Sequence, residues 1–205
     1  EWLSPAMPQK FVYTSSTSVY GQTDGSIVTE ASPADPPTDT GRVLVEAERL
    51  LLDAAQQHGL PAVVLRVAGI YGPGRGYWFK QYLAGTATIE GAGQRVLNMI
   101  HRDDVAGAIT AALRKGRPGQ IYNAVDDEPV TQLAFFQWLS ASTDRPLPPF
   151  VPEDPDVARK RGLTNKRVSN RRLKEELGYC FQYPTFREGY LVQVRLIQAI
   201  ASARK

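Results

Sequence analysis

The stretch FVYTSSTSVYG, from Phe11 to Gly21, decides the fold that we expect for this chain. Its first four residues are aromatic or β-branched and predict a buried strand, and the hydroxyl-rich residues that follow predict a turn. In an open α/β sheet, ligands bind at the carboxyl ends of the strands, because the loops there leave a crevice. Ser15 and Ser16 therefore mark a candidate binding site. The alternative is a plain polar exit from a strand, since Ser and Thr often hydrogen-bond to their own backbone in turns.

Three further motifs follow this stretch in order: LR at residues 65–66 leading to YGPG at 71–74, IHRDDVA at 100–106, and IYN at 121–123. Together with SSTSVYG they resemble the extended short-chain dehydrogenase/reductases, the family of NAD-dependent sugar epimerases and dehydratases. Each motif is moderately specific, but their shared order is hard to obtain by chance. The resemblance implies an α/β fold: the C-terminal part of a doubly wound, Rossmann-type parallel sheet with a small C-terminal substrate lobe.

The same resemblance divides the chain into two parts. Residues 1–144 form a partial NAD(P)-binding domain with lobe segments interleaved, and residues 145–205 form mainly the substrate lobe. In the family, a preceding half carries a glycine motif that binds the cofactor pyrophosphate at a helix N-terminus. No such motif occurs between a strand and a long helix in this sequence. We expect a fragment of a longer chain rather than a degenerate relative, because half a sheet would expose a long apolar edge.

A long helix is expected from residue 41 to about residue 58, with Thr40 as its N-cap and Gly59 after its end. Active members of the family carry a catalytic Tyr on this helix and a Lys four residues later. Aligned through Glu48, those positions hold Thr40 and Leu44. Threonine is far too weak an acid and leucine carries no charge, so the usual proton relay is absent. This combination resembles the atypical short-chain dehydrogenase/reductases.

The long helix is also apolar on two sides, which predicts that both sides are buried. One side packs on the sheet. The other packs either on a partner subunit, as the helical dimer contact of the family implies, or beneath the C-terminal lobe of the same chain.

The resemblance assigns roles to individual residues. Ser16 matches the hydroxyl that hydrogen-bonds the reacting oxygen. Beside this resemblance, Tyr71 and Tyr77 are the nearby phenols that can replace the missing acid, unless they are simply packing residues. The implied cofactor is NAD or NADP, with contacts at Thr14, Ser15, Ser16, Val67 and Ala68. The implied substrate contacts are Gly69, Ile70 and Tyr71. Two nearby arginines, Arg75 and Arg102, are further candidate substrate contacts, because each can bind a phosphate or carboxylate group. For Arg75, an anion ligand and a surface position in a turn are equally good interpretations.

Other helix starts follow from local patterns. Asp103 is expected to cap a helix over residues 104–115, after a strand over 96–100, while Thr131 and Thr185 cap later helices. His101 is one of only two histidines. No metal site is therefore expected, and a structural hydrogen bond is the more common role of a lone histidine.

The composition limits the class of protein. The chain has 205 residues, of which 42% are hydrophobic and 22% charged, as in soluble globular domains. Its single cysteine, Cys180, excludes an internal disulfide and fits a cytoplasmic location. No uncharged run is long enough to span a bilayer. Residues 156–205 hold 12 of the 24 Lys and Arg but 4 of the 21 Asp and Glu. For most of these residues a plain solvated face is the favoured interpretation, and a phosphate-bearing small molecule is the alternative. Nucleic acid is disfavoured, because the region lacks any nucleic-acid-binding signature.

Three functions remain open. The leading hypothesis is an atypical NAD(P)-binding epimerase/dehydratase-like protein for a small polar, phosphorylated or nucleotide-linked molecule. The alternative from another class is a non-catalytic cofactor-binding sensor or scaffold. The third is an active epimerase whose proton donor has moved to another residue.

Overall fold

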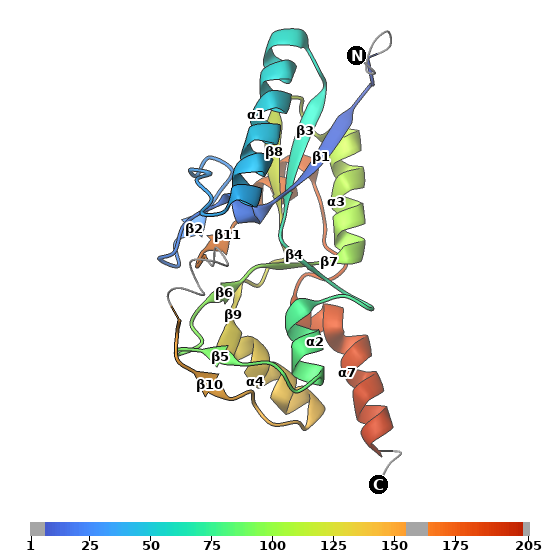
Figure 1. Ribbon diagram of the computed structural model, residues 1–205. Helices are drawn as coiled ribbons and strands as arrows, with labels where there is room; N and C mark the ends of the chain where they lie inside the picture. Colours follow the sequence, from blue (N-terminus) through green and yellow to red (C-terminus); the bar gives the residue numbers. More distant parts are fainter. Residues whose placement is uncertain (1–6, 155–163, 203–205) are drawn as a thin grey trace.

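The computed structural model of the chain describes residues 7–154 and 164–202. Its main sheet contains three parallel strands in the order β1 (Phe11–Ser16), β3 (Ala62–Val67) and β8 (Gln120–Ala124) (Figure 1). Every residue of the central strand β3 is buried, because it is flanked by strands and made of Val, Leu and Ala around one arginine. Ser16 pairs with Val67, and Val67 pairs with Ala124, so the three strands end at one edge. The predicted α/β fold is confirmed.

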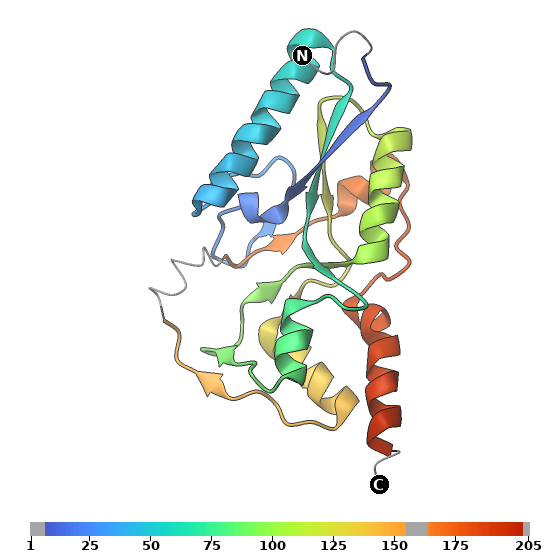
Figure 2. The same ribbon diagram turned by 45° about the vertical axis from the view of Figure 1, so that its right-hand side comes forward.

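Two helices, α1 (Asp39–His58) and α3 (Arg102–Lys115), lie on either side of this sheet in both views (Figures 1 and 2). Leu44 and Val45 of α1 and Ala108 and Ala112 of α3 pack in the same core cluster as the strands. The apolar face of each helix thus covers one face of the sheet.

The predicted caps of both helices are wrong by two residues. The N-cap of α1 is Thr38, whose Oγ1 accepts from the Gly41 amide at 3.1 Å, while Thr40 lies exposed in the first turn. The N-cap of α3 is His101, whose Nδ1 accepts from the Asp103 amide at 3.2 Å. His101 therefore has a structural hydrogen bond, and α3 begins earlier than the sequence pattern indicates.

A second hydrophobic cluster forms a lobe beyond the carboxyl ends of the sheet strands (Figures 1 and 2). It is built on α2 (Tyr77–Leu83), α4 (Gln132–Thr143) and α7 (Phe186–Ser202). The predicted cap of α4 is confirmed, since Thr131 Oγ1 accepts from the Ala134 amide at 3.2 Å. Thr185 also caps α7, where its Oγ1 accepts from the Arg187 amide at 3.2 Å.

Short strands connect the sheet to the lobe. The strand expected over residues 96–100 is broken at Asn98, whose amide side chain donates to Lys166 O at 2.9 Å and accepts from the Val168 amide at 2.8 Å. The remaining elements are η1 (Thr17–Val19), β2 (Ile27–Val28), β4 (Gly69–Tyr71), β5 (Ile89–Glu90), β6 (Val96–Leu97), β7 (Met99–His101), β9 (Val130–Thr131), β10 (Phe150–Val151), β11 (Arg167–Val168) and α6 (Arg171–Leu177).

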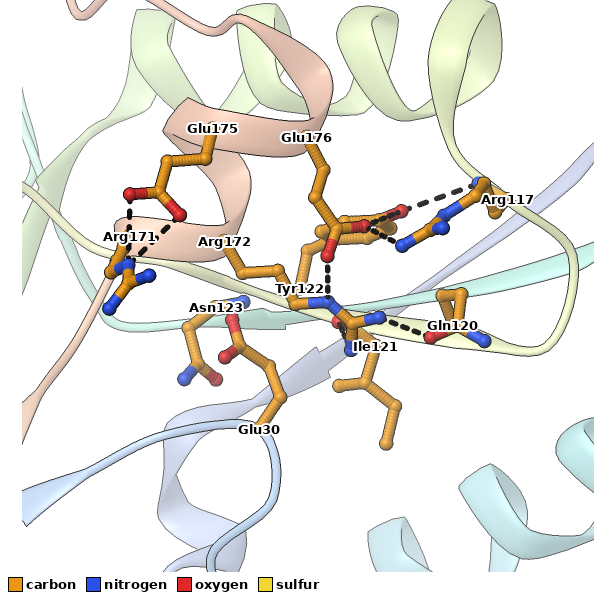
Figure 3. Close-up of polar contacts among 10 residues, drawn as sticks. All are labelled: Glu30, Arg117, Gln120, Ile121, Tyr122, Asn123, Arg171, Arg172, Glu175 and Glu176. Atoms are coloured by element: carbon orange, nitrogen blue, oxygen red, sulfur yellow. Dashed lines mark hydrogen bonds and ion pairs between the residues drawn. The ribbon is translucent and has the colours of Figure 1, made fainter.

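Side chains close the outer edge of β8 (Figure 3). The amide of Asn123 donates to Glu30 Oε1 at 2.8 Å, and the carbonyl of Ile121 accepts from Arg172 Nη1 at 3.2 Å. Glu176, one turn further along α6, holds Arg172 Nε at 2.7 Å. These backbone groups are the ones that another strand would need, so the sheet ends at β8.

None of the helices in the described ranges combines the length and the hydropathy that a bilayer span requires.

Candidate functional site

A cavity of about 520 Å³ lies at the carboxyl end of β1, between the main sheet and the lobe. Parallel strands direct their ends and following loops to one side, which is why segments far apart in the sequence meet here. The lining comes from the end of β1 and η1, from β4 to the start of α2, from residues 95–99, from the segment before β11, and from α7. Five residues that the sequence singles out share this cavity: Ser16, Gly69, Ile70, Tyr71 and Arg75.

Ser16 is the last residue of β1 and the N-cap of η1. Its Oγ accepts from the Ser18 amide at 3.1 Å, which orients the side chain. A hydroxyl that accepts one hydrogen bond still has its own hydrogen to donate. Ser16 can therefore donate to an oxygen of a ligand in the cavity.

Tyr71 is held by the lobe. Its hydroxyl donates to Thr185 O at 3.1 Å, and its ring stacks on Tyr190 with centroids 4.7 Å apart. Burial, together with the nearby carboxylate of Asp126, raises the pKa of the phenol well above its usual range. A Cβ at Gly189 would lie 2.4 Å from the Tyr71 hydroxyl, so α7 needs glycine there to approach the ring. These contacts favour the packing role that the sequence left open.

The residues expected at the cofactor lie at or near the strand ends. Ser15, Val67 and Ala68 are buried, whereas Thr14 is exposed. The Oγ of Ser15 is buried and has no hydrogen-bond partner among the described residues, although a buried hydroxyl normally has one. This hydrogen-bonding capacity is thus unused by the described residues, although Ser15 is not among the described residues that line the cavity.

Arg102, the remaining expected substrate contact, is not among the described residues that line the cavity. Its Nη1 donates to Pro73 O at 3.1 Å, and its Nε lies 3.3 Å from Asp103. The positions aligned with the family's catalytic pair are also elsewhere: Thr40 is exposed on α1 and Leu44 packs against the main core.

Lys166 is the functional candidate that the sequence motifs did not identify. It lies in the segment before β11, is 5% exposed, and lines the cavity. Its Nζ donates to Tyr20 O at 2.7 Å and to Thr164 Oγ1 at 2.5 Å. Burial lowers the pKa of this amine to about 8. Its distance in sequence from Ser16 explains why no local motif contains both residues.

The described lining of the cavity is basic. It includes Arg75, Arg95 and Lys166 but no Asp or Glu. The Arg95 guanidinium lies 5.1 Å from the centroid of the Trp78 ring and 3.7 Å from Glu90, which fixes its position. Within the part of the chain that the structure describes, no three His, Cys, Asp or Glu side chains cluster as metal ligands.

Comparison with known proteins shows which family this chain resembles. The sequence profile of the NAD dependent epimerase/dehydratase family matches residues 1–124. Protein YeeZ of Escherichia coli K12 is 34% identical over 178 residues, which cover 85% of this chain and 59% of YeeZ.

Two solved structures are also similar. A functionally unknown conserved protein from Silicibacter pomeroyi superposes with a TM-score of 0.78 at 36% identity, covering 93% of this chain and 66% of that one. A dTDP-glucose 4,6-dehydratase from Bacillus anthracis, solved in complex with NAD, gives a TM-score of 0.76 at 22% identity, covering 93% and 62%. The chain thus spans less than two thirds of the length of these relatives. On the family match over more than half of its residues, this chain belongs to the NAD dependent epimerase/dehydratase family.

Proposed function

We propose that this chain is part of an atypical NAD(P)-dependent enzyme that acts on a small polar molecule, free or nucleotide-linked. The observation that carries the proposal is the cavity at the carboxyl end of β1, which brings the Ser16 hydroxyl together with the loop that follows β4. Family membership supports a cofactor-dependent activity, and the NAD in the similar dehydratase structure supports the choice of cofactor.

The residues at the strand ends fit a nicotinamide group. Ser15 offers a buried hydroxyl that has no partner among the described residues, and Val67 and Ala68 offer buried apolar surface at the end of β3 and directly after it. We assign the cofactor contacts to Thr14, Ser15, Ser16, Val67 and Ala68. When bound, a nicotinamide supplies or accepts a hydride.

The chain's own contribution is orientation of the substrate. Ser16 donates a hydrogen bond to the substrate oxygen at the reacting carbon, where it stabilises developing negative charge. Gly69 and Ile70 form the wall beside it, and Arg75 holds an anionic group at the open side of the cavity. Tyr71 keeps this wall in place through its bond to Thr185 O.

The test uses the full-length protein and follows nicotinamide absorbance with a panel of nucleotide-sugars and small hydroxy and keto compounds. For any compound that is turned over, Ser16→Ala should lower turnover by about 10²- to 10³-fold, the usual cost of losing one donor to a developing oxyanion. Ser32→Ala is the matched control, because the Ser32 hydroxyl also accepts from a backbone amide, that of Thr29 at 2.9 Å, and Ser32 is not among the described residues that line the cavity. If the Ser16→Ala variant turned over substrate as fast as wild type, Ser16 would have no role in the reaction.

A second function, a non-catalytic sensor or scaffold that binds the cofactor, is favoured by one observation. The positions of the family's Tyr and Lys hold an exposed threonine, Thr40, and a core leucine, Leu44. A sensor predicts saturable binding of NADH or NADPH, measured by nicotinamide fluorescence, with no turnover of any compound in the panel. Turnover that depends on Ser16 would exclude it.

A further inference from the structure

Lys166 is a buried ammonium group without a counter-ion among the described residues. Its two hydrogen bonds go to neutral oxygens, the Tyr20 carbonyl and the Thr164 hydroxyl. An ammonium group has three hydrogens to donate, so one has no partner among the described residues. Burying a charge without a carboxylate partner is costly, and burial is the sole cause of the lowered pKa of Lys166. A lysine kept in such a place is expected to have a ligand.

The surroundings of Lys166 add positive charge rather than neutralise it. The titratable groups in the described lining are Arg75, Arg95, Tyr71, Tyr77 and Tyr190 in addition to Lys166. Both arginines are cationic, and tyrosines carry no charge near neutral pH. The Arg75 guanidinium is exposed and makes no side-chain hydrogen bond or ion pair with any described residue. Lys166 and Arg75 thus each have hydrogen-bond donors that no described residue uses.

We propose that Lys166 is the anion-binding residue at the buried side of this cavity and that the ligand carries a carboxylate or phosphate group bound there. Arg75 provides a second, exposed contact for the same ligand. This inference rests on the proposed function, because it takes this cavity to be the substrate site. It narrows the substrate from a small polar molecule to an anionic one.

A purely structural role is the competing explanation. In that case Lys166 only ties the Tyr20 carbonyl to Thr164, and replacing it changes stability but not the binding of anions. The two explanations differ in the effect of pH. A ligand anion requires the protonated amine, so its affinity falls by about tenfold per pH unit above the pKa of Lys166. A structural lysine imposes no such dependence.

The experiment measures binding of malonate and of inorganic phosphate to the full-length protein by calorimetry. Malonate carries a constant charge from pH 7 upward, so the pH profile is recorded with malonate between pH 7 and 10. Lys166→Met should weaken binding roughly 10- to 100-fold, the usual effect of losing a hydrogen bond to a charged group. Lys166→Arg should retain binding and lose the fall in affinity above pH 8. Lys174→Met is the control, since Lys174 pairs with Asp127 outside the cavity.

Direct ¹⁵N NMR of the Lys166 amine keeps the test independent of how well the variants fold. Adding malonate or phosphate should raise the pKa of Lys166 in the wild-type protein, and the anion that does so identifies the ligand as a carboxylate or a phosphate. The proposal is overturned if neither anion changes that pKa, or if Lys166→Met binds both anions as tightly as wild type. Nicotinamide fluorescence on the same samples reports cofactor binding separately, so a failure of this inference is distinguished from a failure of the proposed function.

Discussion

Asp126 is a buried carboxyl group that no ion pair neutralises among the described residues. It is 1% exposed, its Oδ1 accepts from the Glu128 amide at 3.2 Å, and its buried Oδ2 has no hydrogen-bond partner in the part of the chain that the structure describes. Burial raises the pKa of this group to about 8. The carboxyl is thus protonated in the folded protein at neutral pH.

This shift predicts that stability falls as pH rises. The unfolded chain releases the Asp126 proton near pH 4, whereas the folded chain keeps it until about pH 8. Between these values the folded state binds more protons, so the free energy of unfolding decreases with increasing pH. Asp126→Asn keeps the Oδ1 acceptor and removes the titration. It should be more stable than wild type at pH 8, on the order of a few kcal/mol, and similar near pH 4.

Urea unfolding of the full-length protein at pH 4.5 and pH 8 measures this difference. Asp127→Asn is the neighbouring control, because Asp127 pairs with Lys174 and should not gain stability when its charge is removed. A wild-type protein that is more stable than Asp126→Asn at both pH values would show that the buried carboxyl is stabilised as an anion.

At the scale of elements, Asp104 anchors the segment that leads to α7. It lies at the start of α3, is fully buried, and accepts three hydrogen bonds. The donors are the Tyr179 hydroxyl at 2.7 Å, the Gln182 amide at 2.8 Å and the Tyr183 amide at 2.9 Å. One carboxylate thus joins a helix of the sheet layer to the chain entering the lobe.

We predict that Asp104→Asn lowers the free energy of unfolding by about 1–3 kcal/mol, because an amide nitrogen cannot accept the bonds that one carboxylate oxygen accepts. The amides of Gln182 and Tyr183 should also exchange faster with solvent, as measured by hydrogen exchange. Asp103→Asn is the control and should change both properties far less, since the Asp103 side chain is 45% exposed. Equal effects of the two variants would argue against the anchor.

The elements show what local sequence determines. The buried strands follow from runs of apolar residues, and the caps Thr131 and Thr185 stand alone at their helix starts, so these were predicted. Where two residues that can cap a helix lie close together, the local pattern does not decide between them. The N-cap of α3 is His101 rather than Asp103. The strand expected over residues 96–100 is broken because the Asn98 side chain forms hydrogen bonds with the backbone of a segment about 70 residues away.

At the scale of the whole molecule, α1 leaves an apolar face uncovered. Val43 and Leu50 are 68% and 57% exposed. They lie on the same face of the helix, because a spacing of seven residues is about two helical turns. The C-terminal lobe lies beyond the strand ends (Figure 2) and, in the described residues, leaves these side chains exposed. The sequence left two explanations for this apolar side: packing on a partner subunit, or burial beneath the C-terminal lobe of the same chain. We therefore propose that a partner subunit covers it.

The full-length protein is accordingly predicted to be a homodimer through α1. Leu50→Asp should shift it to monomers in sedimentation experiments, because a charge on this face would be buried without a partner. Val192→Asp serves as control, since Val192 is 72% exposed on α7, in the lobe. If the Val192→Asp variant were monomeric while the Leu50→Asp variant remained a dimer, the interface would lie elsewhere than on α1.

The candidate site shows the same limit of sequence reasoning on a larger scale. Motifs located Ser16, Gly69, Ile70, Tyr71 and Arg75, which the fold brings to one cavity. Residues 166–170 resemble a segment of the family, but the pattern assigned no site role to Lys166, because Lys166 approaches the cavity only through tertiary structure, where its Nζ meets Tyr20 O. A buried cation without a counter-ion is a property of packing, which a single sequence does not reveal.

The most direct test of the central claim is a crystal structure of the full-length protein with NAD or NADP. We expect the nicotinamide ring to lie against Ser15, Ser16, Val67 and Ala68, with its reactive face toward the cavity that Lys166 lines. A dinucleotide bound away from the end of β1, or crystals that stay free of cofactor at saturating NAD and NADP, would contradict it.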